Sequence, residues 1–427
     1  MKRDIYNKLL QWKNDSNRKP LIITGARQVG KTWIMREFGK NEYANVVYIN
    51  CDNEKRIETL LSEDYNIDRI LLGLQAISGV NIKSDKTLII FDEIQQIPRG
   101  LHLLKYFYEE NPEYHVMVAG SLLGITLNQG VSFPVGKVDI MEMNPMNFNE
   151  FLEAMGQEQL LKVLNTNDWK LIDSLSTKYI ELLRQYYYVG GMPEAVYSYC
   201  KDKNLAQVRN IQNNILKAYR NDISKHATKS ESVKIGQVLD SLPSQLSKEN
   251  KKFIYGVIKT GARAAEYELA IQWLIDAGIV LKVNRIKEAK MPLKFYEDIS
   301  AFKLFLLDMG LFACMCDVPA SEMLVGNNVF VEYKGAFAEQ YVLQQLVCQN
   351  VKPYYWSSEK TDFVIQKDNK IIPIEVKAEV NVKARSLRQF ITNNPELKAV
   401  RFSMLGYAEQ NWMTNIPLYY TSAIDMI

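Results

Sequence analysis

The fold is decided by the stretch Gly25-Ala26-Arg27-Gln28-Val29-Gly30-Lys31-Thr32. This stretch fits the pattern G-x-x-x-x-G-K-[ST] of the phosphate-binding P-loop. The apolar run 21–23 before it is typical of a buried strand, and residues 31–38 after it are typical of a helix, with Gly39 at a C-cap position. Backbone N–H groups in such a loop wrap a β-phosphate at the N-terminus of the helix. The stretch therefore predicts a nucleotide-binding site to which all eight residues contribute.

Two side chains of the loop have distinct predicted roles. Lys31 is expected to reach the β- and γ-phosphate oxygens, and Thr32 is expected to offer its hydroxyl to Mg²⁺. The metal also needs a carboxylate from a neighbouring strand, and the apolar run 87–91 ends in Asp92 and Glu93. Asp92 is expected to hold Mg²⁺, largely through water, and Glu93 to orient and deprotonate the attacking water. The alternative is a strand that ends in two solvated acids.

A third polar position follows the next expected strand. Residues 114–119 are followed by Gly120 and Ser121. A polar side chain at this point can contact the γ-phosphate, so Ser121 is a candidate sensor; the alternative is an ordinary turn residue. The predicted catalytic residues are therefore Lys31, Glu93 and Ser121.

Composition limits the class of protein. A chain of 427 residues is too long for one core and indicates two or three domains. Its 47% hydrophobic and 24% charged content is ordinary for a soluble protein, and its net charge of +3 argues neither for nor against nucleic acid. No apolar run reaches the ~18 residues of a membrane span. We expect no contact with a membrane.

The cysteines and histidines are few and scattered. The five cysteines form no C-x-x-C pair and the three histidines lie far apart, which excludes a zinc site and a disulfide framework. The N-terminal residues 1–15 lack a signal-peptide core and are typical of a short amphipathic helix. A reducing, cytoplasmic location is expected.

The pattern along the chain predicts an α/β protein with several parts. Apolar strands alternating with helices describe a parallel sheet covered on both faces; they are expected at 21–24, 45–50, 87–91, 114–119 and 137–142. A mostly helical region follows, then an order of helices and strand at 226–290 that fits a winged-helix module, and finally a return to α/β. The predicted parts are a P-loop core at 1–143, a helical lid at 144–225, a winged-helix-like module at 226–325 and a C-terminal domain at 326–427.

Several motifs occur together in a fixed order. They are GARQVGKT, FDEIQ, VAGS, YYVGGMPEAV, FKLFLLDMGL and IPIEVK. Over nearly its whole length the chain resembles the prokaryotic AAA+-type ATPases that carry a C-terminal domain of unknown function. The resemblance implies ATP and Mg²⁺ as ligands, an AAA-like core, a helical and winged-helix middle, and a C-terminal domain related to PD-(D/E)XK nucleases.

One position departs from this family. Its members usually carry Gly-Arg before the fifth strand, whereas this chain has Gly136-Lys137. Lysine is a point charge without the fork that spans phosphate oxygens. Either ATP hydrolysis is slow, or another arginine contacts the γ-phosphate in place of the missing one. Arg184 and Arg220 on the following helices are candidates for this role; the alternative is that both are ordinary surface residues.

The middle of the chain offers two functional interpretations. The tyrosines 186–188, before the paired glycines 190–191, are expected to pack rather than to bind. The winged-helix interpretation makes DNA a candidate partner, through a recognition segment that includes Lys259, Arg263, Tyr267 and Trp273. This segment is not strongly basic, and a protein partner is the alternative.

The C-terminal region contains a second group of acids. Residues 361–377 predict a β-hairpin with Asp368-Asn369 at its turn, so residues whose numbers sum to 737 face each other. Asp362 then lies opposite Glu375, with Lys377 on the same face.

This is the layout of a PD-(D/E)XK site, in which two carboxylates hold Mg²⁺ and the lysine steadies the attacking water. By resemblance, Glu339 on the preceding helix is an additional acid. The alternative is a structural ion pair between Lys377 and Glu375 in a domain without nuclease activity.

Two functions follow from these interpretations. The first is an ATP-hydrolysing switch or motor coupled to a nuclease-like C-terminal domain that acts on nucleic acid. The second is an ATP-driven switch that docks a protein partner and cuts nothing.

Overall fold

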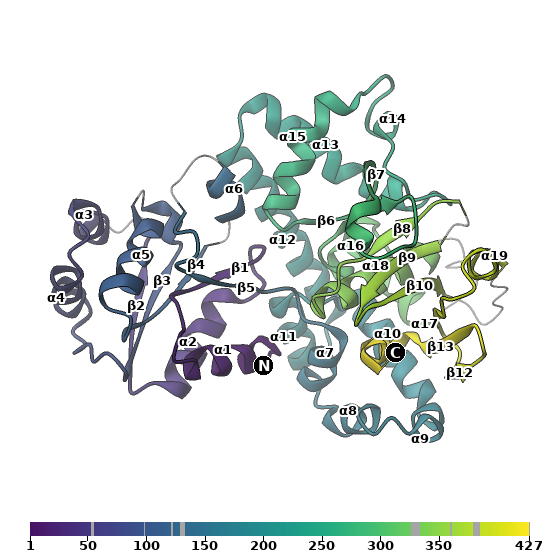
Figure 1. Ribbon diagram of the computed structural model, residues 1–427, viewed down its shortest axis with the longest axis horizontal. Helices are drawn as coiled ribbons and strands as arrows, with labels where there is room; N and C mark the ends of the chain where they lie inside the picture. The colour runs from purple at the N-terminus through teal and green to yellow at the C-terminus, as the bar shows by residue number, and fades with distance from the viewer. Residues whose placement is uncertain are drawn as a thin grey trace. The chain divides into compact units, whose positions relative to one another are not determined.

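The structure, a computed structural model (Figure 1), describes residues 1–52, 55–97, 99–120, 123–128, 133–325, 334–358, 361–378 and 385–426. Ser121 lies outside these residues, so its predicted sensor role stays a prediction. The chain divides into two compact units. The smaller unit comprises Lys2–Asn144 with Asp276–Gly278, and the larger unit comprises Met1, Pro145–Ile275 and Ile279–Ile427.

The smaller unit is built on a parallel five-stranded sheet, which confirms the predicted α/β core. Its strand order is β2-β3-β4-β1-β5, and every pairing is parallel. The strands are β1 (Leu21–Thr24), β2 (Asn45–Asn50), β3 (Thr87–Asp92), β4 (His115–Ala119) and β5 (Asp139–Glu142). All residues of β3 and β4 are buried, because helices cover both faces of the sheet, and this explains their uninterrupted apolar runs.

Helices lie on both faces of this sheet (Figure 1). The helices of the smaller unit are α1 (Ile5–Asn14), α2 (Lys31–Glu42), α3 (Lys55–Glu63), α4 (Ile67–Ser78), the short η1 (Ile94–Gln96), α5 (Gly100–Glu110) and α6 (Leu123–Asn128). The apolar sides of α3, α4 and α5 form one core with alternate residues of the strands. The helix α1 buries Ile5, Leu9 and Trp12, as its amphipathic pattern predicts.

The helix after the P-loop is longer than predicted. We expected it to end near Phe38 with Gly39 as its C-cap, but α2 continues to Glu42. Gly39 is buried inside the helix, where a Cβ atom would lie 2.8 Å from a methyl group of Val46. The glycine therefore allows α2 to lie close to β2, and this packing role overrides its cost within a helix.

The larger unit begins with helices and continues into a mixed sheet. The helices are α7 (Phe148–Ala154), α8 (Glu158–Leu164), α9 (Trp169–Ser174), α10 (Ser176–Val189), α11 (Pro193–Asp202), α12 (Leu205–His226), α13 (Lys229–Leu246), α14 (Tyr255–Ile258), α15 (Ala264–Asp276), α16 (Met309–Met315), α17 (Ala320–Val325), α18 (Lys334–Cys348) and α19 (Arg385–Asn393), with the short η2 (Leu293–Tyr296) and η4 (Leu418–Met426).

One eight-stranded sheet runs through the larger unit. Its order is β12-β13-β11-β10-β9-β8-β6-β7. The strands are β6 (Val280–Ile286), β7 (Glu297–Leu306), β8 (Tyr354–Trp356), β9 (Thr361–Lys367), β10 (Lys370–Lys377), β11 (Ala399–Ser403), β12 (Ala408–Glu409) and β13 (Met413–Pro417). The β6–β7 hairpin, which falls in the predicted part 226–325, pairs with β8 through Arg285 and Tyr355. The last two predicted parts of the chain thus share a single sheet.

The predicted C-terminal hairpin is confirmed with its register. Lys367 pairs with Lys370 and Phe363 with Ile374, and both pairs sum to 737. Asp368 and Asn369 have φ of 46° and 60°, the left-handed values that a two-residue type I′ turn requires.

A buried carboxylate joins distant parts of the larger unit. Asp308 accepts hydrogen bonds from the backbone N–H groups of Gly191 at 2.6 Å and of Leu311 at 2.9 Å. The side-chain amide of Gln344 on α18 also donates to it, at 3.3 Å. Two of the sequence motifs, YYVGGMPEAV and FKLFLLDMGL, therefore meet at one residue, and their role here is structural. Tyr186, Tyr187 and Tyr188 are buried, which confirms that they pack.

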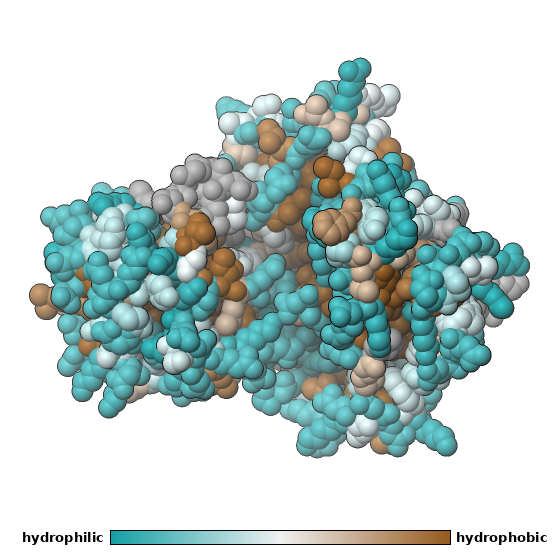
Figure 2. All heavy atoms as spheres, viewed as in Figure 1, coloured by the Kyte–Doolittle hydropathy of each residue, from teal (hydrophilic) through white to brown (hydrophobic). Residues whose placement is uncertain are grey.

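Among the residues that the structure describes, no helix is both long and apolar enough to cross a bilayer. In the view of Figure 2, the surface over α3 and α4 is mostly hydrophilic.

Candidate nucleotide-binding site

The P-loop has the backbone that its sequence predicts. Gly25 has a φ of 130° and Gly30 a φ of 99°, and Gln28 also has a positive φ, of 66°. A Cβ atom on Gly25 would lie 2.2 Å from the carbonyl oxygen of Met143, so only glycine fits there. Gly30 is the N-cap of α2, whose first backbone N–H groups are the ready-made donors for phosphate oxygens.

Lys31 is buried and held within the loop. Its Nζ donates to the carbonyl oxygens of Gly25 at 2.8 Å and Ala26 at 2.7 Å. Burial lowers the pKa of Lys31 to about 8, while the nearby carboxylates of Glu93 and Asp92 oppose this shift. The ammonium group is therefore directed at the centre of the P-loop, in a site where an anionic ligand would stabilise its charge.

Asp92 collects two hydroxyl groups at the end of β3. Its Oδ2 accepts a hydrogen bond from the Thr32 hydroxyl at 2.6 Å and from the Tyr48 hydroxyl at 2.9 Å. A threonine hydroxyl and a carboxylate oxygen at hydrogen-bonding distance are suitable ligands for Mg²⁺. The donor set at Thr32 and Asp92 thus fits the predicted metal. Tyr48 was not predicted, because its place on β2 gives no local sequence signal for this contact.

Glu93 follows Asp92 in an unusual backbone conformation. Its φ of 54° and ψ of 41° are left-handed, which is uncommon for a residue other than glycine. Such conformations cluster at functional sites. Gln95 on η1 donates its side-chain amide to the Glu93 carboxylate. This second contact was also not predicted.

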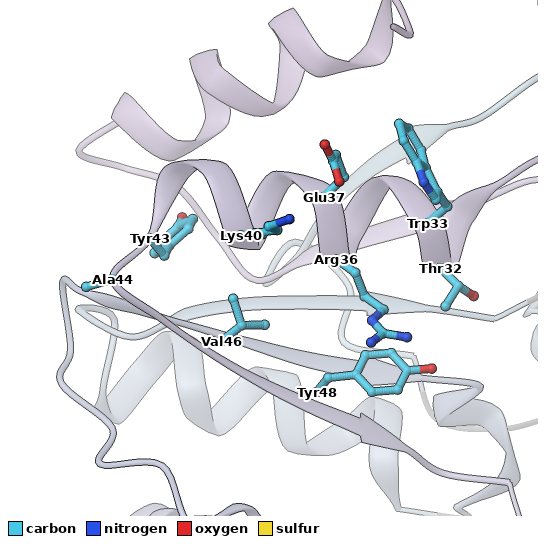
Figure 3. Close-up of a pocket in the computed structure, with 9 residues that line it drawn as sticks. All are labelled: Thr32, Trp33, Arg36, Glu37, Lys40, Tyr43, Ala44, Val46 and Tyr48. Atoms are coloured by element: carbon cyan, nitrogen blue, oxygen red, sulfur yellow. The ribbon is translucent and has the colours of Figure 1, made fainter. Parts of the chain in front are cut away.

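A groove lies beside Thr32, between α2 and the edge strand β2 (Figure 3). It has a volume of about 800 Å³. Thr32, Trp33 and Arg36 line it from the helix, and Tyr48 lines it from the strand. The Arg36 guanidinium lies 4.9 Å from the centre of the Tyr48 ring. Arg36 thus packs on the tyrosine whose hydroxyl is bound to Asp92.

The lysine that departs from the family pattern is engaged elsewhere in the smaller unit. Lys137 Nζ lies 2.9 Å from a carboxylate oxygen of Glu109 and 5.4 Å from the centre of the Tyr108 ring, both on α5. The two candidate arginines belong to the larger unit. Arg184 is on α10, and Arg220 on α12 pairs with Asp240 at 2.7 Å. Their role in place of the family's arginine stays a prediction.

The C-terminal acids are arranged differently from the predicted metal site. Asp362 Oδ2 accepts a hydrogen bond from the backbone N–H of Val376 at 2.8 Å. Glu375 is buried and pairs with Lys377 at 3.0 Å, which confirms that these two residues share a face. In the parallel pairing of β10 with β11, Glu375 also lies beside Arg401.

Lysines surround the third acid of this region. Glu339 on α18 is buried and pairs with Lys251 at 2.5 Å and Lys303 at 3.4 Å. Burial acts to raise the pKa of Glu339, but the two lysines outweigh it and lower this pKa. Burial and the charge of Glu339 raise the pKa of Asp362 to about 7. Glu339 and Asp362 thus interact with each other and with two ammonium groups.

As the structure places them, these three acids are not gathered into a metal site. Within the described parts of the chain, no group of three or more Asp, Glu, His or Cys side chains is placed to hold a metal ion. Glu339 has lysines where the prediction placed Mg²⁺, and Glu375 is neutralised by Lys377. The predicted ligand set of Glu339, Asp362 and Glu375 therefore gains no support from the geometry.

The predicted DNA-recognition residues are partly buried. Tyr267 is 4% exposed and donates its hydroxyl to Gln237 at 2.9 Å, and Trp273 is half-buried. Lys259 and Arg263 remain exposed, but both precede α15. The helix α15 contains no basic residue, and its exposed positions carry Ala265, Glu266, Glu268, Leu269 and Gln272.

Comparison with known proteins identifies the class of the smaller unit. Residues 17–152 match the family model of an AAA domain. The matched segment contains the P-loop, and it is followed by residues that match two domains of unknown function, DUF8612 at 180–322 and DUF4143 at 334–420. A search of curated proteins gives no match.

Three solved structures are distantly similar. The Walker-type ATPase PABY2304 of Pyrococcus abyssi is 13% identical with a TM-score of 0.45, over 74% of this chain and 95% of that chain. Cdc6p of Pyrobaculum aerophilum is 11% identical with a TM-score of 0.26, over 76% and 96%. AMPPCP-bound DnaA of Aquifex aeolicus is 15% identical with a TM-score of 0.26, over 64% and 86%.

Proposed function

We propose that this protein is a Mg²⁺-dependent ATP-hydrolysing switch. The observation that carries the proposal is the convergence of Lys31, Thr32 and Asp92 on one P-loop, with Glu93 directly after the metal ligand. The AAA domain at 17–152 supports ATP as the nucleotide. All eight residues of Gly25–Thr32 bind the phosphates, and Ser121 senses the γ-phosphate.

The polar side chains of the site divide the tasks of this reaction among them. Lys31 binds the β- and γ-phosphate oxygens, and Thr32 and Asp92 hold Mg²⁺, which neutralises charge on the phosphates when bound. Glu93 accepts a proton from the attacking water through its carboxylate. ATP binding and proton transfer thus depend on different side chains, so mutations can separate the two.

The test of this proposal is an ATPase assay with a matched pair of variants. The wild-type protein is expected to hydrolyse ATP only with Mg²⁺. Glu93→Gln should bind ATP with wild-type affinity and turn over at least a hundredfold more slowly, since the amide cannot accept the proton. Lys31→Ala should lose binding. A Glu93→Gln variant that hydrolyses ATP at the wild-type rate would remove Glu93 from the role of base.

The larger unit is proposed to dock a protein partner. Support comes from α15, which is the recognition helix of the winged-helix-like module predicted at 226–325. Its exposed side carries Glu266, Glu268 and Leu269 and no basic residue, and a DNA phosphate backbone would repel the two carboxylates.

ATP binding is expected to alter proteolytic cutting at 144–150 and 189–193. The ATPase rate is expected to be the same with and without added DNA; stimulation by DNA would contradict a protein partner.

A coupled nuclease is the second candidate function. The observation in its favour is the hairpin, which brings Glu375 and Lys377 to the end of β10 beside Asp362. This function requires the full chain to bind Mg²⁺ or Mn²⁺ in its C-terminal part, and to melt at a higher temperature with the metal, by mass action. The Glu375→Gln variant should then lose this response, while a Thr32→Ala variant should retain it. If the metal changes the melting temperature of wild type and of Glu375→Gln by the same amount at every concentration, the nuclease is excluded.

A further inference from the structure

The side chain of Gln95 lies between the ends of two neighbouring strands. Gln95 belongs to η1, directly after Glu93, and its Nε2 donates to an oxygen of the Glu93 carboxylate. The strands β3 and β4 are paired up to Asp92 and Ala119, so Glu93 and Gly120 follow at adjacent strand ends. Gln95 thus contacts the proposed base from one side and faces the end of β4 from the other.

Gly120 provides the space that Gln95 occupies. A Cβ atom on Gly120 would lie 2.0 Å from Oε1 and 2.9 Å from Cδ of Gln95. The Oε1 atom is buried and has no hydrogen-bond partner among the described residues. The amide is therefore held by contact on the Gly120 side and by a hydrogen bond on the Glu93 side.

The orientation of the amide follows from the charge of Glu93. Only the NH₂ end of the glutamine can donate to a carboxylate, and the opposite orientation would place two oxygens against each other. The position of Glu93 also needs support, because its backbone is in the sparsely populated left-handed region. A hydrogen bond to a braced neighbour restricts the carboxylate to one position.

We propose that Gln95 is a positioning residue that braces against Gly120 and holds the Glu93 carboxylate where it can accept the proton of the attacking water. This inference rests on the proposed ATPase function. It also gives a physical role to Gly120, which the sequence marks only as part of a strand end. The base, its amide support and the end of β4 act together.

The first test separates turnover from binding. Gln95→Ala is expected to lower kcat about a hundredfold, the cost of a misplaced group, and to leave KM for ATP and the melting temperature unchanged. Gln95→Glu keeps the size of the side chain, but its carboxylate repels Glu93, so kcat should fall at least as far as in Gln95→Ala. Gln96→Ala is the matched control, because Gln96 is the exposed neighbour on η1, and it should retain wild-type kcat.

The second test uses the contact with Gly120. Gly120→Ala must displace the Gln95 amide, so it should also lower kcat. In the Gln95→Ala background, Gly120→Ala should lower kcat much less, because the amide that it would displace is absent. The added Cβ would also lie 2.8 Å from Leu123, but this contact is present in both backgrounds and cancels in the cycle.

The outcomes are distinct. Suppose that the wild-type protein hydrolyses ATP. If Gln95→Ala then has the same kcat, or if the effects of Gly120→Ala and Gln95→Ala on kcat are strictly additive, the role of Gln95 is overturned and the proposed function stands. A wild-type protein that binds ATP and never hydrolyses it overturns both.

Discussion

The backbone N–H of Gly191 donates to the carboxylate of Asp308 across 117 positions of sequence, at 2.6 Å. Leu311 and Gln344 donate to the same buried carboxylate. Removing the acceptor leaves these donors unpaired in the interior, where each costs about 1–3 kcal/mol. Asp308→Ala is therefore expected to destabilise the larger unit by about 3 kcal/mol or more and to lower its melting temperature. Asp308→Asn, which keeps one acceptor oxygen, should lose less; equal melting of all three proteins would show that Asp308 is not a structural hub.

The lowered pKa of Lys31 predicts a pH dependence of ATP binding. Bound phosphates favour the charged ammonium, so they raise the pKa of Lys31 from its free value of about 8. Below that pH the lysine is charged with and without ATP, and affinity should not change. Above it, the free lysine is neutral and must take up a proton, so affinity should fall as pH rises.

Calorimetry measures this proton uptake directly. At pH 9, the heat of ATP binding should differ between two buffers of different ionisation enthalpy, and at pH 6.5 the buffers should agree as far as Lys31 is concerned. Equal affinity at pH 7 and pH 9.5 without proton uptake would contradict a lowered pKa for Lys31.

Tyr48 is expected to orient Asp92, the proposed metal ligand. The Tyr48→Phe substitution removes one of two hydroxyl donors to Asp92 Oδ2, and a hydrogen bond to a charged group contributes about 1.5–3 kcal/mol. Affinity for ATP should therefore fall about tenfold in the presence of Mg²⁺ and stay unchanged in EDTA. Tyr114→Phe is a control on a half-buried tyrosine outside the site. An equal loss with and without Mg²⁺ would mean that Tyr48 only packs against Arg36.

Asp362 should make the larger unit less stable as pH rises. Its pKa in the folded protein is raised above the unfolded value of about 4. A carboxyl group with a raised folded-state pKa favours folding when it is protonated, so this contribution is lost between about pH 4 and the folded pKa near 7.

The Asp362→Asn variant isolates this effect. Asparagine keeps an oxygen that can accept from Val376 and does not titrate. The variant should therefore melt higher than wild type at pH 8, and the difference should vanish near pH 4. A variant that melts lower than wild type at pH 8 would show that the charged carboxylate is stabilised by Lys251 and Lys303.

The local parts of this structure were predictable, and the reason is the short range of their signals. The P-loop, the five strands and the hairpin turn at Asp368-Asn369 each depend on neighbouring residues, and all were confirmed. Even the hairpin register followed from the turn, since a two-residue turn fixes which residues pair.

Contacts between distant segments were not predictable. Glu339 meets Lys251 and Lys303 from 88 and 36 positions away, and no pattern in the sequence links them. The hairpin register predicted that Asp362 and Glu375 face each other. In the structure Asp362 accepts a hydrogen bond from the Val376 N–H, and Glu375 pairs with Lys377. Tyr48 was missed for the same reason, since the pairing of β2 with β3 brings it to Asp92.

The continuous sheet of the larger unit has a consequence for how this protein can be divided. A chain cut within 326–333 would separate the β6–β7 hairpin from β8, and it would leave unpaired N–H and C=O groups along both broken edges. Exposed edges of this kind recruit strands from other molecules. The two C-terminal segments, which match separate family models, therefore complete one sheet together, and a fragment of either is expected to expose an unpaired edge and to aggregate.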